Sequence, residues 1–100
     1  MILRMYSIFD SKAQAYLLPF FMPNNQMAER HFRDACTEDG HPFAKNPADY
    51  TLFYMGEWDE NEGSVMPSRD KVALGNGVEY VAQLDASFTN IENSIGIKEA

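Results

Sequence analysis

The sequence has a single cysteine, few basic residues and no long apolar run, and each shortage excludes a class of protein. With Cys36 alone, the chain cannot form an internal disulfide, so it is not a small secreted domain held by cross-links. No stretch approaches the ~18 apolar residues of a membrane span, and Arg4 interrupts the first apolar run. We therefore expect a soluble protein of the cytoplasm with no membrane segment.

Basic residues are scarce and the acidic ones are unevenly spread. Eight Lys and Arg stand against fifteen Asp and Glu, for a net charge of −7. Residues 57–100 carry three basic and nine acidic groups, a balance of 3 − 9 = −6. Proteins that bind duplex DNA depend on Lys and Arg to neutralise phosphates, so an acidic domain is a poor candidate for that role. Any nucleic-acid site is expected in the nearly neutral residues 1–56.

Residues for metal or catalytic chemistry are also few. His31, His41 and Cys36 are too few nitrogen and sulfur ligands to complete a tetrahedral zinc site. The acidic residues 57–62 do not match a calcium loop, because glycine comes one place early and Asp70 stands where a bidentate Glu is needed. No nucleophile–base motif or phosphate loop is present. We expect no metal, no cofactor and no catalytic residue, and therefore a binding protein.

The apolar pattern predicts strands in the first and middle parts of the chain. Residues 2–9 and 15–18 are rich in strand-forming residues and are separated by turn chemistry at Asp10, which predicts a hairpin. Residues 50–58 form the strongest strand pattern and carry apolar bulk on both faces. A sheet covered on more than one side is the expected setting for that strand.

One amphipathic helix is predicted over residues 26–37. Asn24 or Asn25 can cap its start, and Gly40 can end it. The apolar face that should contact the sheet consists of Ala28, Phe32, Ala35 and Cys36.

The second half of the chain is predicted to hold shorter elements. We expect a loop over residues 41–47, a short strand at 64–66, one or two helical turns between 68 and 74, and a strand at 78–84 with alternating apolar residues. The predicted fold is a single α+β domain over residues 1–84 of order ββαββ(α)β. Its sheet is mainly antiparallel, with the main helix on one face. Residues 85–100 are expected to form a weakly structured or partner-docked tail.

The aromatic residues support two alternatives, a base-stacking surface or a hydrophobic core. Aromatic rings beside basic groups can stack the bases of a single strand, whereas a domain this small also needs most of its rings for its core. The candidate nucleic-acid-binding residues are Arg4, Lys12, Arg30, Arg33, Tyr6 and Tyr16. Residues 20–22 lie between Pro19 and Pro23 and cannot be regular throughout. The candidate interface residues are Phe20, Phe21, Phe53 and Trp58.

Several short motifs, in a fixed order, resemble a known viral family. They read YSIFDSKA at residues 6–13, AY at 15–16, PFF at 19–21, RHFRD at 30–34, NPADYTLF at 46–53 and GEWD at 56–59. Residues 1–80 resemble the small non-structural protein of gokushoviruses, which are single-stranded DNA phages. The resemblance implies a non-structural protein of the host cytoplasm, outside the virion, and it implies no catalytic residue.

Two functions follow as hypotheses from these observations. The first is a phage non-structural protein that binds single-stranded DNA during genome replication or packaging. The alternative is an interaction factor that contacts a phage or host replication protein and no nucleic acid, which the net charge of −7 favours. A homodimer is expected in either case, because one helix covers only one face of a sheet whose middle strand is apolar on both.

Overall fold

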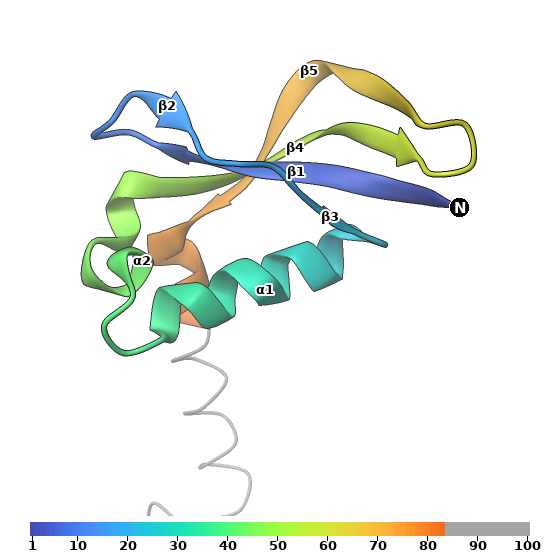
Figure 1. The fold of residues 1–100 in the computed structure, drawn as a ribbon. Coiled ribbons are helices and arrows are strands. Elements are labelled where there is room, and N and C mark those ends of the chain that lie inside the picture. Colours follow the sequence, from blue (N-terminus) through green and yellow to red (C-terminus); the bar gives the residue numbers. More distant parts are fainter. Residues whose placement is uncertain (84–100) are drawn as a thin grey trace, which may run out of the picture.

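The computed structural model describes residues 1–83 of the chain. The elements, in chain order, are β1 (Ile2–Asp10), β2 (Ala15–Tyr16), β3 (Phe20–Met22), α1 (Asn25–Thr37), α2 (Pro42–Lys45), the 3-10 turn η1 (Pro47–Asp49), β4 (Tyr50–Asp59) and β5 (Ser64–Asn76) (Figure 1). Residues 77–83 are helical.

The strands form one antiparallel sheet with α1 beneath it. The strand order is β2-β1-β4-β5, and β3 pairs with β1 as well. Residues Arg4 to Tyr6 of β1 pair with both β3 and β4, so β3 lies on the same side of β1 as β2. Figure 1 shows the helices of residues 1–83 all on one side of a strongly curled sheet. The predicted α+β fold, with a mainly antiparallel sheet and the main helix on one face, is confirmed.

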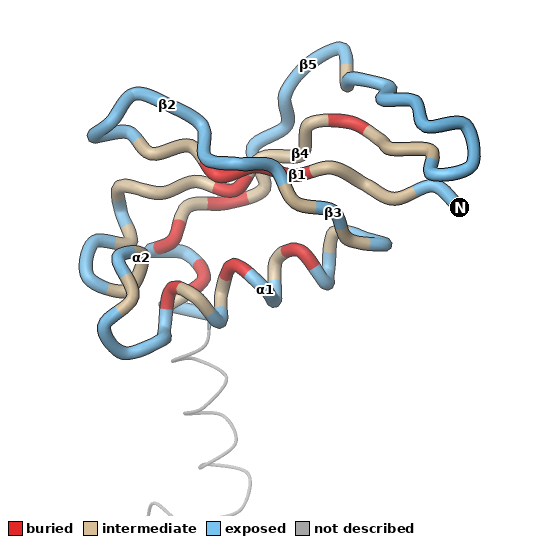
Figure 2. The backbone as a smooth tube through the Cα atoms, in the orientation of Figure 1, coloured by how far each residue is buried: buried red, intermediate tan, exposed pale blue. Residues whose placement is uncertain are grey.

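The hydrophobic core lies between α1 and the sheet. The buried apolar residues are Tyr6, Ile8, Ala28, Phe32, Cys36, Leu52 and Tyr80 (Figure 2). The predicted buried face of α1 is confirmed at Ala28, Phe32 and Cys36. Asn24 caps the helix, because its side-chain oxygen accepts the backbone N–H of Met27 at 2.9 Å. Burial raises the pKa of the Cys36 thiol to about 11, as expected of a core cysteine.

The third strand, β3, does not follow from the sequence prediction. Residues Phe20–Met22 are extended and pair with β1, with Phe20 opposite Tyr6 and Met22 opposite Arg4. Pro19 and Pro23 limit this strand to three residues, because proline cannot donate to a sheet ladder. The prediction that this segment is irregular was therefore wrong, although the prolines do bound it.

The prediction of helical turns over residues 68–74 was also wrong. One long edge strand, β5, runs through them, and it pairs at Pro67 with Gly56 and at Val72 with Tyr54. Residues 68–71 therefore bulge out opposite Met55. Gly56 has φ +146° and permits this arrangement, since a Cβ there would lie 2.4 Å from the carbonyl oxygen of Met66. Pairing with β4 overrides the local helical preference.

The predicted strand over residues 78–84 is a helix as far as the structure describes it, through residue 83. A reciprocal cap at Asn76 and Glu79 explains this difference. The Asn76 side chain accepts the N–H of Val78 at 3.0 Å, and the Glu79 carboxylate accepts the N–H of Asn76 at 3.4 Å. This arrangement is a capping box, a helix start signal. Residue 84 and the predicted tail at 85–100 lie outside the described residues.

Tyr80 supports a prediction about stability. Its ring packs edge-on against Phe32 at 5.5 Å and sits against Gly75, where a Cβ would lie 2.8 Å from the ring. The hydroxyl is buried without a hydrogen-bond partner among residues 1–83. A buried hydroxyl without a partner costs roughly 1–3 kcal/mol. We therefore expect the free energy of unfolding of Tyr80→Phe at neutral pH to equal or exceed that of the natural protein. Urea denaturation measures this, and a loss above about 1 kcal/mol would contradict it.

The same hydroxyl predicts an alkaline loss of stability. Burial raises the pKa of Tyr80 from 10.0 to about 12 in the folded protein. The folded protein keeps this hydroxyl protonated at pH values where the unfolded chain has already lost the proton. The free energy of unfolding is therefore unaffected below the unfolded pKa of 10.0 and falls as the pH rises from 10.0 to about 12. The Tyr80→Phe variant should lose less stability than the natural protein across that interval.

Candidate nucleic-acid interface

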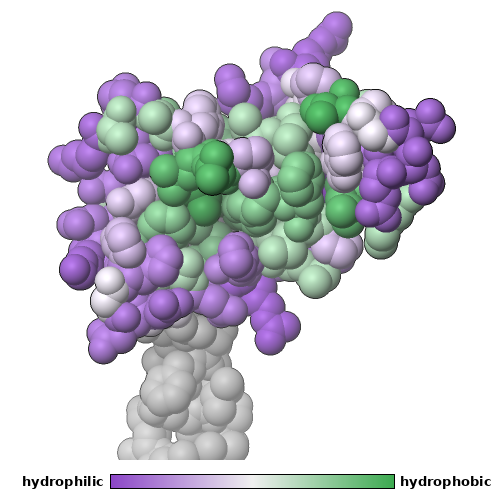
Figure 3. All heavy atoms as spheres, viewed as in Figure 1, coloured by the Kyte–Doolittle hydropathy of each residue, from purple (hydrophilic) through white to green (hydrophobic). Residues whose placement is uncertain are grey.

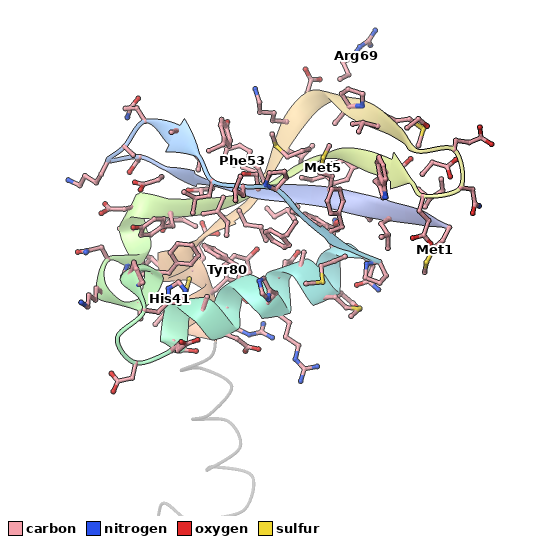
Figure 4. The ribbon with its side chains drawn as sticks, viewed as in Figure 1. Met1, Met5, His41, Phe53, Arg69 and Tyr80 are labelled. Atoms are coloured by element: carbon pink, nitrogen blue, oxygen red, sulfur yellow. The ribbon has the colours of Figure 1, made fainter. Side chains whose placement is uncertain are left out.

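The helices of residues 1–83 leave one face of the sheet open. Tyr6 and Ile8 of β1 point into the core, so Met5, Ser7 and Phe9 lie on the opposite face by strand alternation. Residues paired across the strands share a face. The open face therefore comprises Leu3, Met5, Phe9, Tyr16, Phe21, Phe53, Trp58, Val65 and Ala73, and Ser7 lies on the same side but is only 2% exposed. Figure 4 shows Met5 and Phe53 on the side away from α1, and His41 and Tyr80 on the helical side.

Three rings gather at one end of the open face, beside the β1–β2 turn. The centroids of Phe9 and Tyr16 are 4.9 Å apart, and those of Tyr16 and Phe53 are 5.6 Å apart. The Lys71 ammonium lies 5.5 Å from the Tyr16 centroid. We call these four residues the turn-end cluster. Its lysine comes from edge strand β5 and its tyrosine from β2, so the cation reaches across the sheet.

The two basic groups at this end are positioned by local backbone structure. Lys12 is exposed on a turn that Asp10 fixes, because its carboxylate accepts the N–H groups of Lys12 at 3.0 Å and Ala13 at 3.2 Å. Lys71 ends the bulge of residues 68–71, in which the Ser68 hydroxyl donates to the carbonyl of Asp70 at 2.6 Å. Arg69, in the same bulge, is exposed and projects away from the sheet (Figure 4).

The other end of the open face is apolar with an acidic border. The rings of Phe21 and Trp58 are 6.2 Å apart, and Val65 pairs with Trp58 from β5. Phe21 is 40% exposed and Val65 51% exposed. We call Phe21, Trp58 and Val65 the hairpin-end cluster. The adjoining β4–β5 hairpin carries Glu57, Asp59, Glu60 and Glu62, and residues 57–68 contain no Lys or Arg.

The edge formed by the β2–β3 connection exposes further apolar surface. Leu18 is 90% exposed there, and Leu17 is 39% exposed. Figure 3 shows apolar side chains across the middle of this side of the molecule, with hydrophilic side chains around its border. The backbone is nevertheless fixed, because the Ser7 hydroxyl donates to the Leu17 carbonyl at 2.7 Å.

The structure divides the predicted nucleic-acid-binding residues among three places. Lys12 and Tyr16 lie at the turn end of the open face. Arg30 and Arg33 lie on α1, on the other side of the sheet. Arg4 lies on the helical side, where its guanidinium is 4.3 Å from the Tyr54 centroid. These residues therefore do not form one surface.

Tyr6 is the clearest correction among these residues. It is 0% exposed, and its hydroxyl donates to the Asn25 side-chain oxygen at 2.7 Å. Burial is the main reason that the pKa of this hydroxyl is raised. The same Asn25 oxygen accepts the Nε–H of Arg4 at 3.0 Å, so both residues attach the start of α1 to β1. The Tyr6 ring cannot stack on a base, and that prediction was wrong.

The predicted interface residues also separate. Phe21, Phe53 and Trp58 lie on the open face. Phe20 instead lies on the helical side. Its ring centroid is 5.7 Å from that of Tyr6, on which it stacks, and 5.1 Å from that of His31. Phe20 therefore belongs with the core residues rather than with an open surface.

Two members of the turn-end cluster were missed from the sequence. Phe9 follows from the alternation of β1 once Tyr6 and Ile8 are known to be buried. Lys71 had no such signal, because residues 68–74 were predicted to be helical. The cluster offers three aromatic rings beside one cation, which is the chemistry of single-strand recognition.

Two further observations concern residues 1–83 alone. No group of three or more His, Cys, Asp and Glu in that part of the chain could hold a metal ion. None of the helices there is long and apolar enough to cross a membrane.

Over the described part of the chain, the fold and this surface define an α+β protein in which one aromatic face of the antiparallel sheet is open. A comparison with protein families matches the family described as Phage ORF5 protein over residues 3–80. The match covers most of the chain, so the chain belongs to the Phage ORF5 protein family and is a phage protein. Comparisons with curated proteins and with solved structures found no match.

Proposed function

We propose that this phage protein is a non-structural, single-stranded DNA-binding protein of the gokushovirus type. It acts in replication or packaging of the phage genome in the host cytoplasm, by binding and without catalysis. The observation that supports this most strongly is the turn-end cluster, in which three aromatic rings lie beside Lys71 on an open sheet face. Membership of a phage family and the gokushovirus resemblance of residues 1–80 agree with it.

Single strands fit this surface better than a duplex does. Unpaired bases present π faces that stack on rings such as Tyr16 and Phe53, and each stacked base contributes about 1–3 kcal/mol. Few phosphates can be neutralised, because among residues 1–83 only Lys12 and Lys71 lie at this end, with Arg69 two residues before Lys71 in the bulge of β5. Duplex binding depends on many such contacts, and a net charge of −7 opposes it.

A salt titration with a fluorescent oligothymidine tests this proposal. For two or three neutralised phosphates, the logarithm of the binding constant should fall with the logarithm of the salt concentration at a slope of about −1.4 to −2.1. The variant Lys12→Ala/Lys71→Ala should bind more weakly, with a slope closer to zero by about 1.4.

A matched control removes the same charge from the other side of the sheet. Arg30→Ala/Arg33→Ala changes the net charge equally but alters only α1. It should leave both affinity and slope nearly unchanged. Equal losses in both double variants would contradict the open-face site, and no binding of the natural protein at low salt would contradict DNA binding altogether.

A second candidate function rests on the apolar surface. Phe21, Val65 and Leu18 are exposed apolar side chains that no base-stacking role requires. An interaction factor for a phage or host replication protein would use them. Absence of oligothymidine binding, together with loss of partner binding in Phe21→Ser, would favour this alternative.

A further inference from the structure

The open face carries opposite charges at its two ends. The turn end has Lys12 and Lys71, both exposed. The hairpin end has Glu60 and Glu62, also exposed, in a segment without a basic residue. β1 runs from one end to the other, from Ile2 opposite Asp59 to Asp10 opposite Ala15. Between the two ends, β1 and β4 present apolar side chains, with Met5 near the middle, and the exposed Arg69 and Asp70 of the β5 bulge border them.

A face of this kind is complementary to itself in one orientation. A two-fold axis in the plane of the interface, perpendicular to β1, places the turn end of each copy over the hairpin end of the other. Basic groups then face acidic groups twice, and the apolar middle parts face each other. In the alternative arrangement, with the two-fold axis along β1, each end of one copy would face the same end of the other. Like charges would then meet, which is unfavourable. Two-fold contacts are also the commonest closed assemblies.

We infer that a second copy of the chain covers the open face of the free protein in this antiparallel arrangement, and that single-stranded DNA displaces it. The inference rests on the proposed function, because the turn-end cluster would be shared by the two ligands. A second copy fits better than an unrelated partner, since this one chain supplies both the acidic and the basic half of the contact. Free protein is then a dimer with its rings covered, and DNA-bound protein is a monomer.

Competition for one surface has a measurable consequence by linkage. DNA binding must weaken self-association by the same factor by which self-association weakens DNA binding. Apparent affinity for DNA should therefore fall as the protein concentration rises above the dimer dissociation constant. Because exposed ion pairs are screened by salt, the dimer should also dissociate more readily at high ionic strength.

Sedimentation equilibrium of the full chain, with and without a short oligothymidine, tests the inference. At low micromolar concentration the free protein should have twice the chain mass of 11.4 kDa. With saturating oligothymidine the protein should sediment as one chain plus one oligonucleotide. A free monomer at every concentration would overturn the dimer, and a dimer that keeps its mass with oligothymidine bound would overturn the competition.

A pair of charge variants tests the orientation. Glu60→Gln/Glu62→Gln removes two charges from the hairpin end, far from the turn-end rings, and should weaken the dimer roughly tenfold through lost ion pairs. It should also raise apparent DNA affinity at concentrations where the natural protein is dimeric. The control Glu38→Gln/Asp39→Asn makes the same charge change beyond the end of α1 and should do neither.

The two proposals fail in distinguishable ways. A salt-sensitive dimer that never binds oligothymidine would overturn DNA binding while retaining the antiparallel contact. A monomer that binds oligothymidine would retain the proposed function and overturn the self-association. A dimer unaffected by Glu60→Gln/Glu62→Gln would overturn the antiparallel orientation.

Discussion

Replacing Phe32 with alanine is expected to lower the free energy of unfolding by about 3–5 kcal/mol. The side chain is fully buried at the centre of the layer between α1 and the sheet. The centroid of its ring lies 5.7 Å from that of Phe43 in α2 and 5.5 Å from that of Tyr80 in the helical residues 77–83. Loss of the ring therefore leaves a cavity between α1 and these two elements. Small domains have only about 5–15 kcal/mol of stability in total, so much of the population could unfold.

Urea denaturation followed by circular dichroism measures this effect. Met27→Ala is the matched control, because Met27 lies on the same helix and is 47% exposed. It should cost well under 1 kcal/mol. Equal effects of the two substitutions, or a cost below about 1 kcal/mol for Phe32→Ala, would contradict the position of the helix.

The second large effect is expected on DNA affinity. Tyr16→Ala/Phe53→Ala removes two of the three rings of the turn-end cluster. Each stacked base contributes about 1–3 kcal/mol. If each of the two rings contributes about 1 kcal/mol, the lower value, the binding of oligothymidine should weaken roughly thirtyfold, and more if the rings contribute more. Neither residue belongs to the buried core, so the fold should persist in the variant.

Fluorescence anisotropy of a labelled oligothymidine measures this loss, with thermal unfolding as the check on the fold. Tyr16→Phe keeps the ring and should retain nearly all of the affinity. If Tyr16→Ala/Phe53→Ala folds and binds as the natural protein does, base stacking at the turn end is wrong.

The main helix and the two central strands, β1 and β4, could be predicted because their signals are local. The helix over Asn25–Thr37 has both a cap and a periodic apolar face. Strands β1 and β4 have continuous runs of strand-forming residues. β5 could not be predicted in the same way, because residues 68–74 become a strand only by pairing with β4 around Gly56. The helix start at Asn76 does have a local signal in Glu79, three residues later, which completes a capping box.

The candidate site was only partly predictable, because a strand alternates its faces with every residue. The sequence identified Tyr16 and Phe53, but it also selected Tyr6, which points to the other face from Phe9. Only the packing of α1 decides which set is buried. Lys71 reaches Tyr16 across three strand-to-strand steps, and no pattern within the chain relates those two positions.

The most direct test of the open-face site is a map of amide chemical shifts as oligothymidine is added to the labelled protein. Binding at the turn-end cluster predicts the largest changes at Phe9, Tyr16, Phe53 and Lys71, with little change along the exposed side of α1. Changes centred on Arg30 and Arg33, or no changes at saturating oligothymidine, would contradict it.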